Sequence, residues 1–142
     1  MKIYIASKYL EHSDINRKIY DILIRHGFDV FLPESINIEG KTENEMRSIA
    51  DICYDAIDLS DIILLVSPFG QSVSAEIGYG IYKKRHQKNT KIVSFRYTHA
   101  NMEKEKSEAM IIPFYDYSVD ATIKDVDTAI AELVQILFAC KG

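Results

Sequence analysis

An unbroken apolar run, Ile62 to Val66 within the segment DIILLVS, restricts the fold more than any other feature of the sequence. A run of strand length with no polar residue is typical of a strand that is covered on both faces, as in a parallel sheet between two layers of helices. Parallel strands cannot be joined by tight turns and need crossover connections, which are usually helices. The run therefore predicts a chain in which strands and helices alternate.

The rest of the sequence shows this alternation. We expect the other strands in the segments 2–7 (KIYIAS), 28–33 (FDVFLP) and 91–97 (KIVSFRY), with a fifth within 111–119 (IIPFYDYSV). Apolar residues at helical spacing predict helices over 13–27, 43–59, about 74–85 and 123–139. The first helix is expected to begin with a cap at Ser13 or Asp14 and to end at Gly27.

These elements predict an α/β fold. We expect a single-domain, doubly wound, Rossmann-like or flavodoxin-like sheet of about five mostly parallel strands, with helices on both faces. The residues expected to face the core are Ile15, Ile19, Ile22 and Leu23 in the first helix and Val126, Ile130, Leu133, Val134 and Leu137 in the last.

Length and composition indicate one domain over residues 1–142. Of these residues 47% are hydrophobic, which is enough to bury a core of ordinary size. No stretch approaches a membrane span and the N-terminus shows no signal peptide, so we expect a cytoplasmic protein that does not act on membranes. Cys53 and Cys140 are then expected to be free thiols. The net charge of -4 argues against a sequence-independent nucleic-acid binder.

Motifs for metals and common cofactors are missing from the sequence. The four histidines do not have the spacing of a metal site, and two lone cysteines do not make a zinc site. Neither G-x-x-x-x-G-K-[ST] nor a G-x-G-x-x-G after the first strand is present. We therefore predict neither a metal nor a cofactor, and a small molecule as the binding partner.

One carboxylate, Glu76, lies among small residues in the segment GQSVSAEIGYG, directly after the apolar strand. Ligands of doubly wound sheets bind beyond the carboxyl ends of the strands and near helix N-termini, and this segment is such a place. Two interpretations are open. In the first, Glu76 lies in the first turn of a helix that starts near Ser74, where the helix dipole favours a carboxylate. In the second, it is a nucleophile held ionised there, and Gly70, Gly78 and Gly80 leave room for a ligand.

The opening KIYIAS, the run AIDLSDIILLVSPFG and the segment SAEIGYGIYKK follow one another between residue 2 and about residue 110. In this order they resemble the nucleoside 2-deoxyribosyltransferase family and its relatives that hydrolyse the N-glycosidic bond of nucleoside 5'-monophosphates. The resemblance implies that Glu76 is the nucleophile that forms a covalent deoxyribosyl-enzyme. It also implies that Tyr4 lies beside Glu76 and orients it, and that the protein is a homo-oligomer, a dimer or higher.

The sequence departs from the family at the residue that helps to protonate the leaving base. Family members usually carry an aspartate eight residues before the position of Asp61, and here that position is Cys53. Asp55 or Asp58 takes over this role only if the helix is rotated or the loop has a different register. Solvated acidic residues on a helix surface are the alternative interpretation of both.

Small and hydroxyl residues are the candidates for binding a sugar or a 5'-phosphate. An acidic element of the transferases is replaced here by Gly70 and Ser72, which resembles the hydrolase branch, where such residues receive the phosphate. Ser7, after the first strand, is a further donor. Ser107 resembles a serine with which the hydrolases contact phosphate from a neighbouring subunit, whereas Asn101 resembles an asparagine of some transferases.

Two main classes of function therefore remain. A third, a subunit that acts mainly through protein contacts, would use the apolar last helix, for which the core of the domain itself is the alternative interpretation. The first is cleavage of the N-glycosidic bond of a 2'-deoxynucleoside or its 5'-monophosphate, through a covalent glutamyl-deoxyribosyl intermediate, with transfer to another base or to water. The second is a non-catalytic sensor that binds a nucleotide on the same fold, which the missing acids at positions 53 and 70 favour.

Overall fold

The computed structural model describes residues 1–7, 9–33, 41–67, 71–87, 89–98 and 115–140. In this part of the chain five strands form one sheet in the order β2-β1-β3-β4-β5, and every neighbouring pair is parallel. The order is that of flavodoxin-like sheets, so the predicted doubly wound α/β fold is confirmed. The strands are β1 Lys2–Ser7, β2 Asp29–Phe31, β3 Ile62–Val66, β4 Lys91–Thr98 and β5 Tyr117–Thr122.

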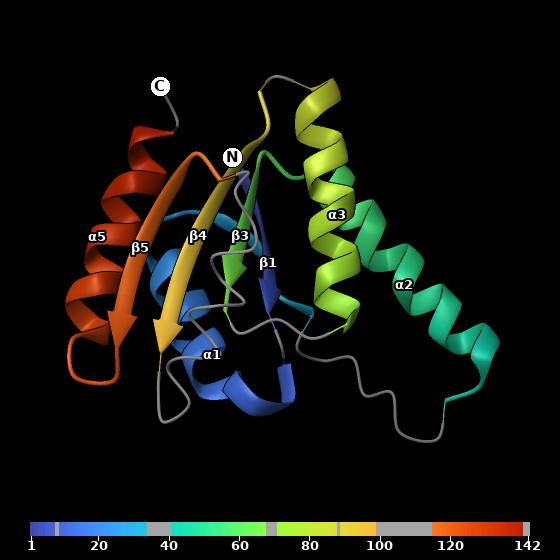
Figure 1. Cartoon of the computed structure of the whole chain (residues 1–142), viewed down its shortest axis with the longest axis horizontal. Coiled ribbons are helices and arrows are strands. Elements are labelled where there is room, and N and C mark those ends of the chain that lie inside the picture. The colour runs from blue at the N-terminus through green and yellow to red at the C-terminus, as the bar shows by residue number, and fades with distance from the viewer. Residues whose placement is uncertain (8, 34–40, 68–70, 88, 99–114, 141–142) are drawn as a thin grey trace.

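Helices cover both faces of the sheet (Figure 1). On one face lie α1, Tyr9–Arg25, and α5, Val126–Ala139, and on the other lie α2, Glu43–Asp58, and α3, Gln71–His86. Strand alternation divides the core accordingly: Ile3 and Ile5 belong to the cluster under α1 and α5, whereas Tyr4 and Ala6 belong to the cluster under α2 and α3. All five residues of β3 are buried, as its apolar run predicts.

Several predicted boundaries were wrong, including the start of α5, which is Val126 instead of Ile123. α1 begins at Tyr9, so Ser13 and Asp14 lie inside the helix instead of capping it. α3 begins at Gln71, three residues before Ser74, and β5 ends at Thr122, beyond the predicted 111–119. Hydrophobic spacing places the start of a helix at its first inward-facing residue. α1 and α3 both begin with residues that precede that position.

The predicted end of α1 is confirmed, because Gly27 has the left-handed conformation with a φ of 83°. The Gly27 amide donates to the Ile24 carbonyl at 3.0 Å, and the Phe28 amide donates to the Leu23 carbonyl at 3.1 Å. These two bonds form a Schellman motif, which favours glycine at the left-handed position. The predicted inward residues of α1 and α5 all belong to the core beneath them.

Lys83 of α3 is buried, and its ammonium group donates hydrogen bonds to backbone carbonyls at the carboxyl end of α2. The side chain donates to the carbonyl oxygens of Ile57 at 2.9 Å, Asp58 at 2.8 Å and Ser60. The last carbonyls of a helix have no partner within the helix and carry its partial negative charge. The last turn of α2 contains no basic residue, so a lysine from the neighbouring helix supplies the missing donor. Sequence analysis of α3 alone cannot reveal this partner.

Gly80 faces β3 where α3 packs on the sheet. A methyl group built at Gly80 would lie 3.4 Å from Cγ1 of Ile63, which is ordinary van der Waals contact. The expectation that Gly80 leaves room for a ligand is therefore wrong, because the space is taken by the packing of the helix on the sheet. Gly78 has no neighbour within 4 Å of such a methyl group.

Two further findings bear on the sequence predictions. Cys53 and Cys140 are both free. No helix in the described ranges is long and apolar enough to cross a membrane.

We expect Lys83→Met to lower the free energy of unfolding by about 2–3 kcal/mol, because the carbonyls at the end of α2 lose a charged donor. Arg85→Met is the matched control, since Arg85 is exposed on the same helix, and it should change stability by less than about 0.5 kcal/mol. Urea unfolding of the two variants measures the difference. Equal losses would show that the Lys83 contacts do not hold α2.

Candidate functional site

β1 and β3 are neighbours at the point where the chain changes direction across the sheet. Ser7, the last residue of β1, pairs in register with Val66, the last residue of β3. The helix after β1 covers one face of the sheet and the helix after β3 covers the other (Figure 1). Such a switch point at the carboxyl ends of the strands is where doubly wound sheets bind ligands.

Tyr4 is a buried residue of β1 whose hydroxyl has no formed hydrogen bond. It lies between Phe31 of β2 and Ile63 of β3. Its ring stacks on that of Phe31, with the centroids 5.5 Å apart and the planes 10° apart. The hydroxyl is buried and has no hydrogen-bond partner among the residues that the structure describes. An unpaired buried hydroxyl is costly, so this group is a candidate for a role beyond packing.

Glu76 lies in the second turn of α3, five residues after Gln71, and is half-buried. The first turn of α3 contains no acidic residue. The interpretation of Glu76 as a first-turn residue stabilised by the helix dipole is therefore wrong, because that effect fades beyond the first turn. Burial instead raises the pKa of the Glu76 carboxyl, and the Tyr4 hydroxyl opposes this shift.

Cys53 of α2 completes a group of three interacting side chains, the Tyr4–Cys53–Glu76 group. Burial raises the pKa of the Cys53 thiol, the charge of Glu76 adds to this shift, and the Tyr4 hydroxyl opposes it. Burial, followed by the charges of Glu76 and Cys53, holds the pKa of Tyr4 above its usual range. Burial thus disfavours the charged form of each member, and the phenol and the thiol are neutral at neutral pH.

The orientation of α2 selects Cys53 over the aspartates around it. Cys53 is 5% exposed, whereas Asp51, Asp55 and Asp58 are all exposed. Asp58 accepts a hydrogen bond from the Tyr79 hydroxyl at 2.7 Å, which raises the pKa of Tyr79 to about 12. The helix is not rotated in the way that would bring Asp55 or Asp58 to Tyr4 and Glu76.

The other sequence-predicted residues are not brought to this group within the described ranges. Ser7 is 8% exposed, but strand alternation turns its side chain to the face of α1 and α5, away from Tyr4. Its hydroxyl has no hydrogen-bond partner there. Ser72 lies in the first turn of α3, and its side chain is outside the described part of the structure. Gly70, Asn101 and Ser107 also lie outside it.

One buried polar residue without a hydrogen-bond partner escaped the sequence analysis. Asn16 of α1 is fully buried, and neither its amide nitrogen nor its amide oxygen has a hydrogen-bond partner among the residues described. The signal is visible in retrospect, because Asn16 shares the inward stripe of Ile19 and Leu23 at spacings of three and seven residues. A polar residue in such a stripe is a candidate for an internal contact.

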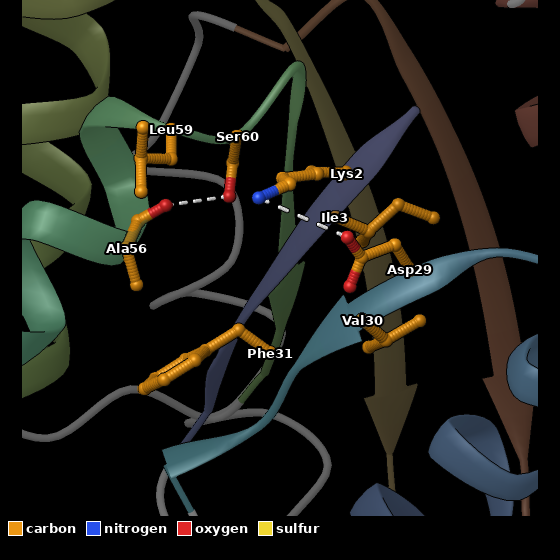
Figure 2. Close-up of a pocket in the computed structure, with 8 residues that line it drawn as sticks. All are labelled: Lys2, Ile3, Asp29, Val30, Phe31, Ala56, Leu59 and Ser60. Atoms are coloured by element: carbon orange, nitrogen blue, oxygen red, sulfur yellow. Dashed lines mark hydrogen bonds and ion pairs between the residues drawn. The ribbon is translucent and has the colours of Figure 1, made fainter.

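A small pocket lies at the opposite edge of the sheet from the switch point. It has a volume of about 140 Å³ and is lined by Lys2, Ile3, Asp29, Val30, Phe31, Ala56, Leu59 and Ser60. Figure 2 shows Lys2 and Asp29 at the starts of β1 and β2, with Ser60 facing them from the end of α2. Lys2 and Asp29 form an exposed ion pair at 3.9 Å, which contributes little. Phe31 connects this pocket to the site, since its ring stacks on Tyr4.

Metal-ligating side chains do not gather in the part of the chain that the structure describes. No group of three or more His, Cys, Asp or Glu residues is placed to hold an ion there. The Tyr4–Cys53–Glu76 group offers one carboxylate, one phenol and one thiol. Its chemistry is that of a single ionisable nucleophile with two protic neighbours.

Comparison with known proteins identifies structural neighbours. No protein-family model matches the sequence, and no curated protein matches it. A 2-deoxyribosyltransferase from Bacillus psychrosaccharolyticus has a similar structure, with a TM-score of 0.56 and 18% identity, over 67% of this chain and 72% of that one. A conserved protein from Enterococcus faecalis V583 gives a TM-score of 0.59 at 16% identity, over 94% of this chain and 98% of that one.

A third neighbour is rubredoxin oxygen:oxidoreductase from Desulfovibrio gigas, with a TM-score of 0.59 and 12% identity over 99% of this chain and 36% of that one. At these identities the similarity shows a shared fold. The neighbours include a transferase and an oxidoreductase, so function has to be argued from the side chains of the site.

The burial of Glu76 predicts a pH-dependent cost to stability. Its pKa is raised in the folded state, so stability is fully present below the unfolded pKa and is lost as the pH rises through the folded pKa. We therefore expect Glu76→Gln to be more stable than the wild type at neutral pH, by on the order of 1 kcal/mol or about 4 °C in Tm. The advantage should vanish below about pH 4, where both side chains are neutral.

Thermal unfolding across this pH range measures the effect. Glu132→Gln, an exposed position on α5, is the control and should show no such dependence. A Glu76→Gln variant that is no more stable at neutral pH, or whose advantage persists in acid, would contradict the assignment of Glu76 as a buried ionising group.

Proposed function

We propose that this protein cleaves the N-glycosidic bond of a 2'-deoxynucleoside or its 5'-monophosphate, with Glu76 as the nucleophile. The observation that carries the proposal is the buried hydroxyl of Tyr4, which has no hydrogen-bond partner and acts on the pKa of the half-buried Glu76 carboxyl. The proposed unit is a single nucleoside deoxyribosyltransferase-like domain over residues 1–142, in a homo-oligomer.

Three independent features support this function. The segments KIYIAS, AIDLSDIILLVSPFG and SAEIGYGIYKK resemble the nucleoside 2-deoxyribosyltransferase family, and Tyr4 and Glu76 come from the first and last of them. The fold is shared with a 2-deoxyribosyltransferase of known structure. A partly desolvated carboxylate next to a hydroxyl donor is also what covalent catalysis at a sugar carbon needs, since the nucleophile must be both ionised and aimed.

In the first step, a Glu76 carboxylate oxygen attacks C1' of the sugar as the bond from C1' to the base nitrogen breaks. The base leaves with that electron pair and takes up a proton. The transition state has oxocarbenium character, and the product is a glutamyl ester of the deoxyribose. When the substrate binds, the Tyr4 hydroxyl, which has no hydrogen-bond partner in the structure, donates to the attacking carboxylate and favours its ionised form.

In the second step, a nucleophile attacks C1' and releases Glu76 as a carboxylate. If the acceptor is the nitrogen of a second base, a new nucleoside forms and the reaction is a transfer. If the acceptor is water, the free sugar or sugar phosphate forms and the reaction is a hydrolysis. Two displacements at C1' retain its configuration in either case.

We expect Glu76→Gln to lower base release by about 10³-fold or more, because the amide cannot form the ester. The measurement is chromatography after incubation with deoxynucleosides and their 5'-monophosphates, with and without an added acceptor base. A new nucleoside with acceptor indicates a transferase, and free base from monophosphates alone indicates a hydrolase.

Glu132→Gln serves as the matched control and should keep wild-type turnover. Turnover by a folded Glu76→Gln variant at the wild-type rate would exclude Glu76 as the nucleophile.

A nucleotide-binding sensor is the second candidate, and the uncharged Cys53 favours it. A thiol whose pKa is raised by burial is a poor proton donor to a leaving base. Under this hypothesis, folded wild-type protein retains an unmodified nucleotide after long incubation and releases no base. Accumulation of free base that depends on Glu76 would exclude it.

A further inference from the structure

The proposed reaction makes no use of the small pocket beside the carboxyl end of α2. Strand alternation turns Lys2 and Tyr4 of β1 to the same face of the sheet, and Asp29 and Phe31 of β2 pair with them in register. Lys2 and Asp29 therefore lie at one end of the pocket and Phe31 at the other (Figure 2). The pocket runs along the starts of two strands toward the stacked ring of Tyr4.

Hydrogen bonds fix the walls of this pocket. Lys83 donates to the Ser60 carbonyl just beyond α2, and the Ser60 hydroxyl donates to the Ala56 carbonyl at 2.7 Å. On the side of the sheet, the backbone amide of Lys2 donates to the Asp61 carboxylate at 2.8 Å. A ligand that binds here does not have to order these walls, which lowers the cost of binding.

Lys2 and Asp29 present opposite charges at the same end of the pocket. Their Nζ and Oδ2 atoms are 3.9 Å apart, which is longer than an N–H···O hydrogen bond, and both side chains are more than half exposed. The ammonium group can donate to a ligand, and the carboxylate can accept from it. A ligand with a hydrogen-bond acceptor next to a donor therefore meets both groups.

The remainder of the pocket suits a flat and largely apolar body of limited size. Phe31, Ala56 and Leu59 contribute an aromatic ring and aliphatic groups to its lining. Its volume is about 140 Å³, and an apolar cavity of about 150 Å³ holds one benzene molecule. One six-membered ring fits this space, whereas a fused purine or a whole nucleoside does not.

We propose that this pocket is a second binding site, for a six-membered cyclic amide or imide whose carbonyl accepts from Lys2 and whose ring N–H donates to Asp29. The face of the ligand ring lies against Phe31 and the end of α2. Phe31 in turn stacks on Tyr4, with the ring centroids 5.5 Å apart, so a ligand in the pocket acts on the Tyr4 ring. Binding needs no turnover; only the consequence of the Tyr4 contact for catalysis rests on the proposed function.

Uracil and 1,3-dimethyluracil are the probes, because methylation removes both ring N–H donors and keeps the ring and its carbonyls. In an NMR titration, uracil should shift the backbone amides of Phe31, Ala56 and Leu59 with a Kd of about 1 mM, the affinity expected for a ligand of this size. The dimethyl compound should bind about fivefold more weakly or worse. No saturable shift of these amides with uracil, or equal binding of both compounds, would overturn the proposal.

Two variants separate the polar contact from the shape of the pocket. Asp29→Ala, at an exposed position, should weaken uracil about fivefold and leave 1,3-dimethyluracil unchanged, because only uracil donates to the carboxylate. Asp21→Ala, exposed on α1, is its control. Ala56→Leu should fill the pocket and abolish uracil binding, whereas Ala131→Leu, exposed on α5, should not. Wild-type uracil affinity in Asp29→Ala would overturn the site, even if Ala56→Leu fails to fold.

Labelling with 3-fluorotyrosine tests the connection to Tyr4. The Tyr4 fluorine resonance is the one that Tyr4→Phe lacks, and uracil should shift it with the same Kd as the pocket amides. Phe31→Leu should keep uracil affinity within about threefold but abolish this shift, because the stack is gone. A Tyr4 resonance that uracil does not move in the wild type, or still moves in Phe31→Leu, would overturn the connection. If base release depends on Glu76 but uracil does not bind, the pocket proposal fails and the proposed function stands.

Discussion

The Lys83 ammonium group holds the end of α2 against α3 through three backbone carbonyls, and the geometry of the site depends on this contact. Cys53 lies one turn before Ile57, whose carbonyl Lys83 binds, and Glu76 lies two turns before Lys83 itself. Gly80, in the same stretch of α3, faces β3. The two helices therefore present Cys53 and Glu76 to Tyr4 from fixed positions on the same face of the sheet.

The Tyr4–Cys53–Glu76 group works against stability in two ways. A buried hydroxyl without a formed hydrogen bond has lost water and gained no partner of equal strength. A half-buried carboxylate must ionise in a medium that disfavours charge, which raises its pKa. Proteins retain such unfavourable groups where they have a function. The loss in stability is offset by the apolar burial of the residues packed around the group, Ile57, Ile63, Val73 and Ile77.

The fold could be predicted because its signals are local and redundant. The apolar run in β3, the spacing in α1 and α5 and the left-handed glycine at the end of α1 each describe a short stretch of chain that behaves as expected. The start of α3 could not be located in this way, since Gln71 precedes the first inward residue, Val73. Because α3 starts three residues earlier than expected, Glu76 lies in the second turn. Burial, and not the helix dipole, is therefore the main influence on its pKa.

The site could be predicted only in part, and Lys83 and Asp55 show why. In the sequence, Lys83 belongs to a basic cluster that suits the end of its own helix, yet its hydrogen bonds go to another helix. In the sequence, Asp55 is as close to the expected acid position as any acidic residue, yet it lies on the exposed side of α2 whereas Cys53 lies on the buried side. The hydrogen bonds of Lys83 and the exposure of Asp55 both depend on contacts between elements. Helical periodicity does not show which element a helix packs against.

The sequence by itself determined the alternation of strands and helices and the parallel sheet, which follow from residue types and spacings along single elements, where side-chain direction is set by the local backbone. The hypothesis that Glu76 is a nucleophile beside Tyr4 came from the resemblance of the sequence to a known family. Only the tertiary structure decided that Tyr4, Cys53 and Glu76 form one group, that Ser7 faces the other side of the sheet, and that Lys83 serves α2. Each of these depends on how rigid elements dock, which is determined by packing between residues far apart in the chain.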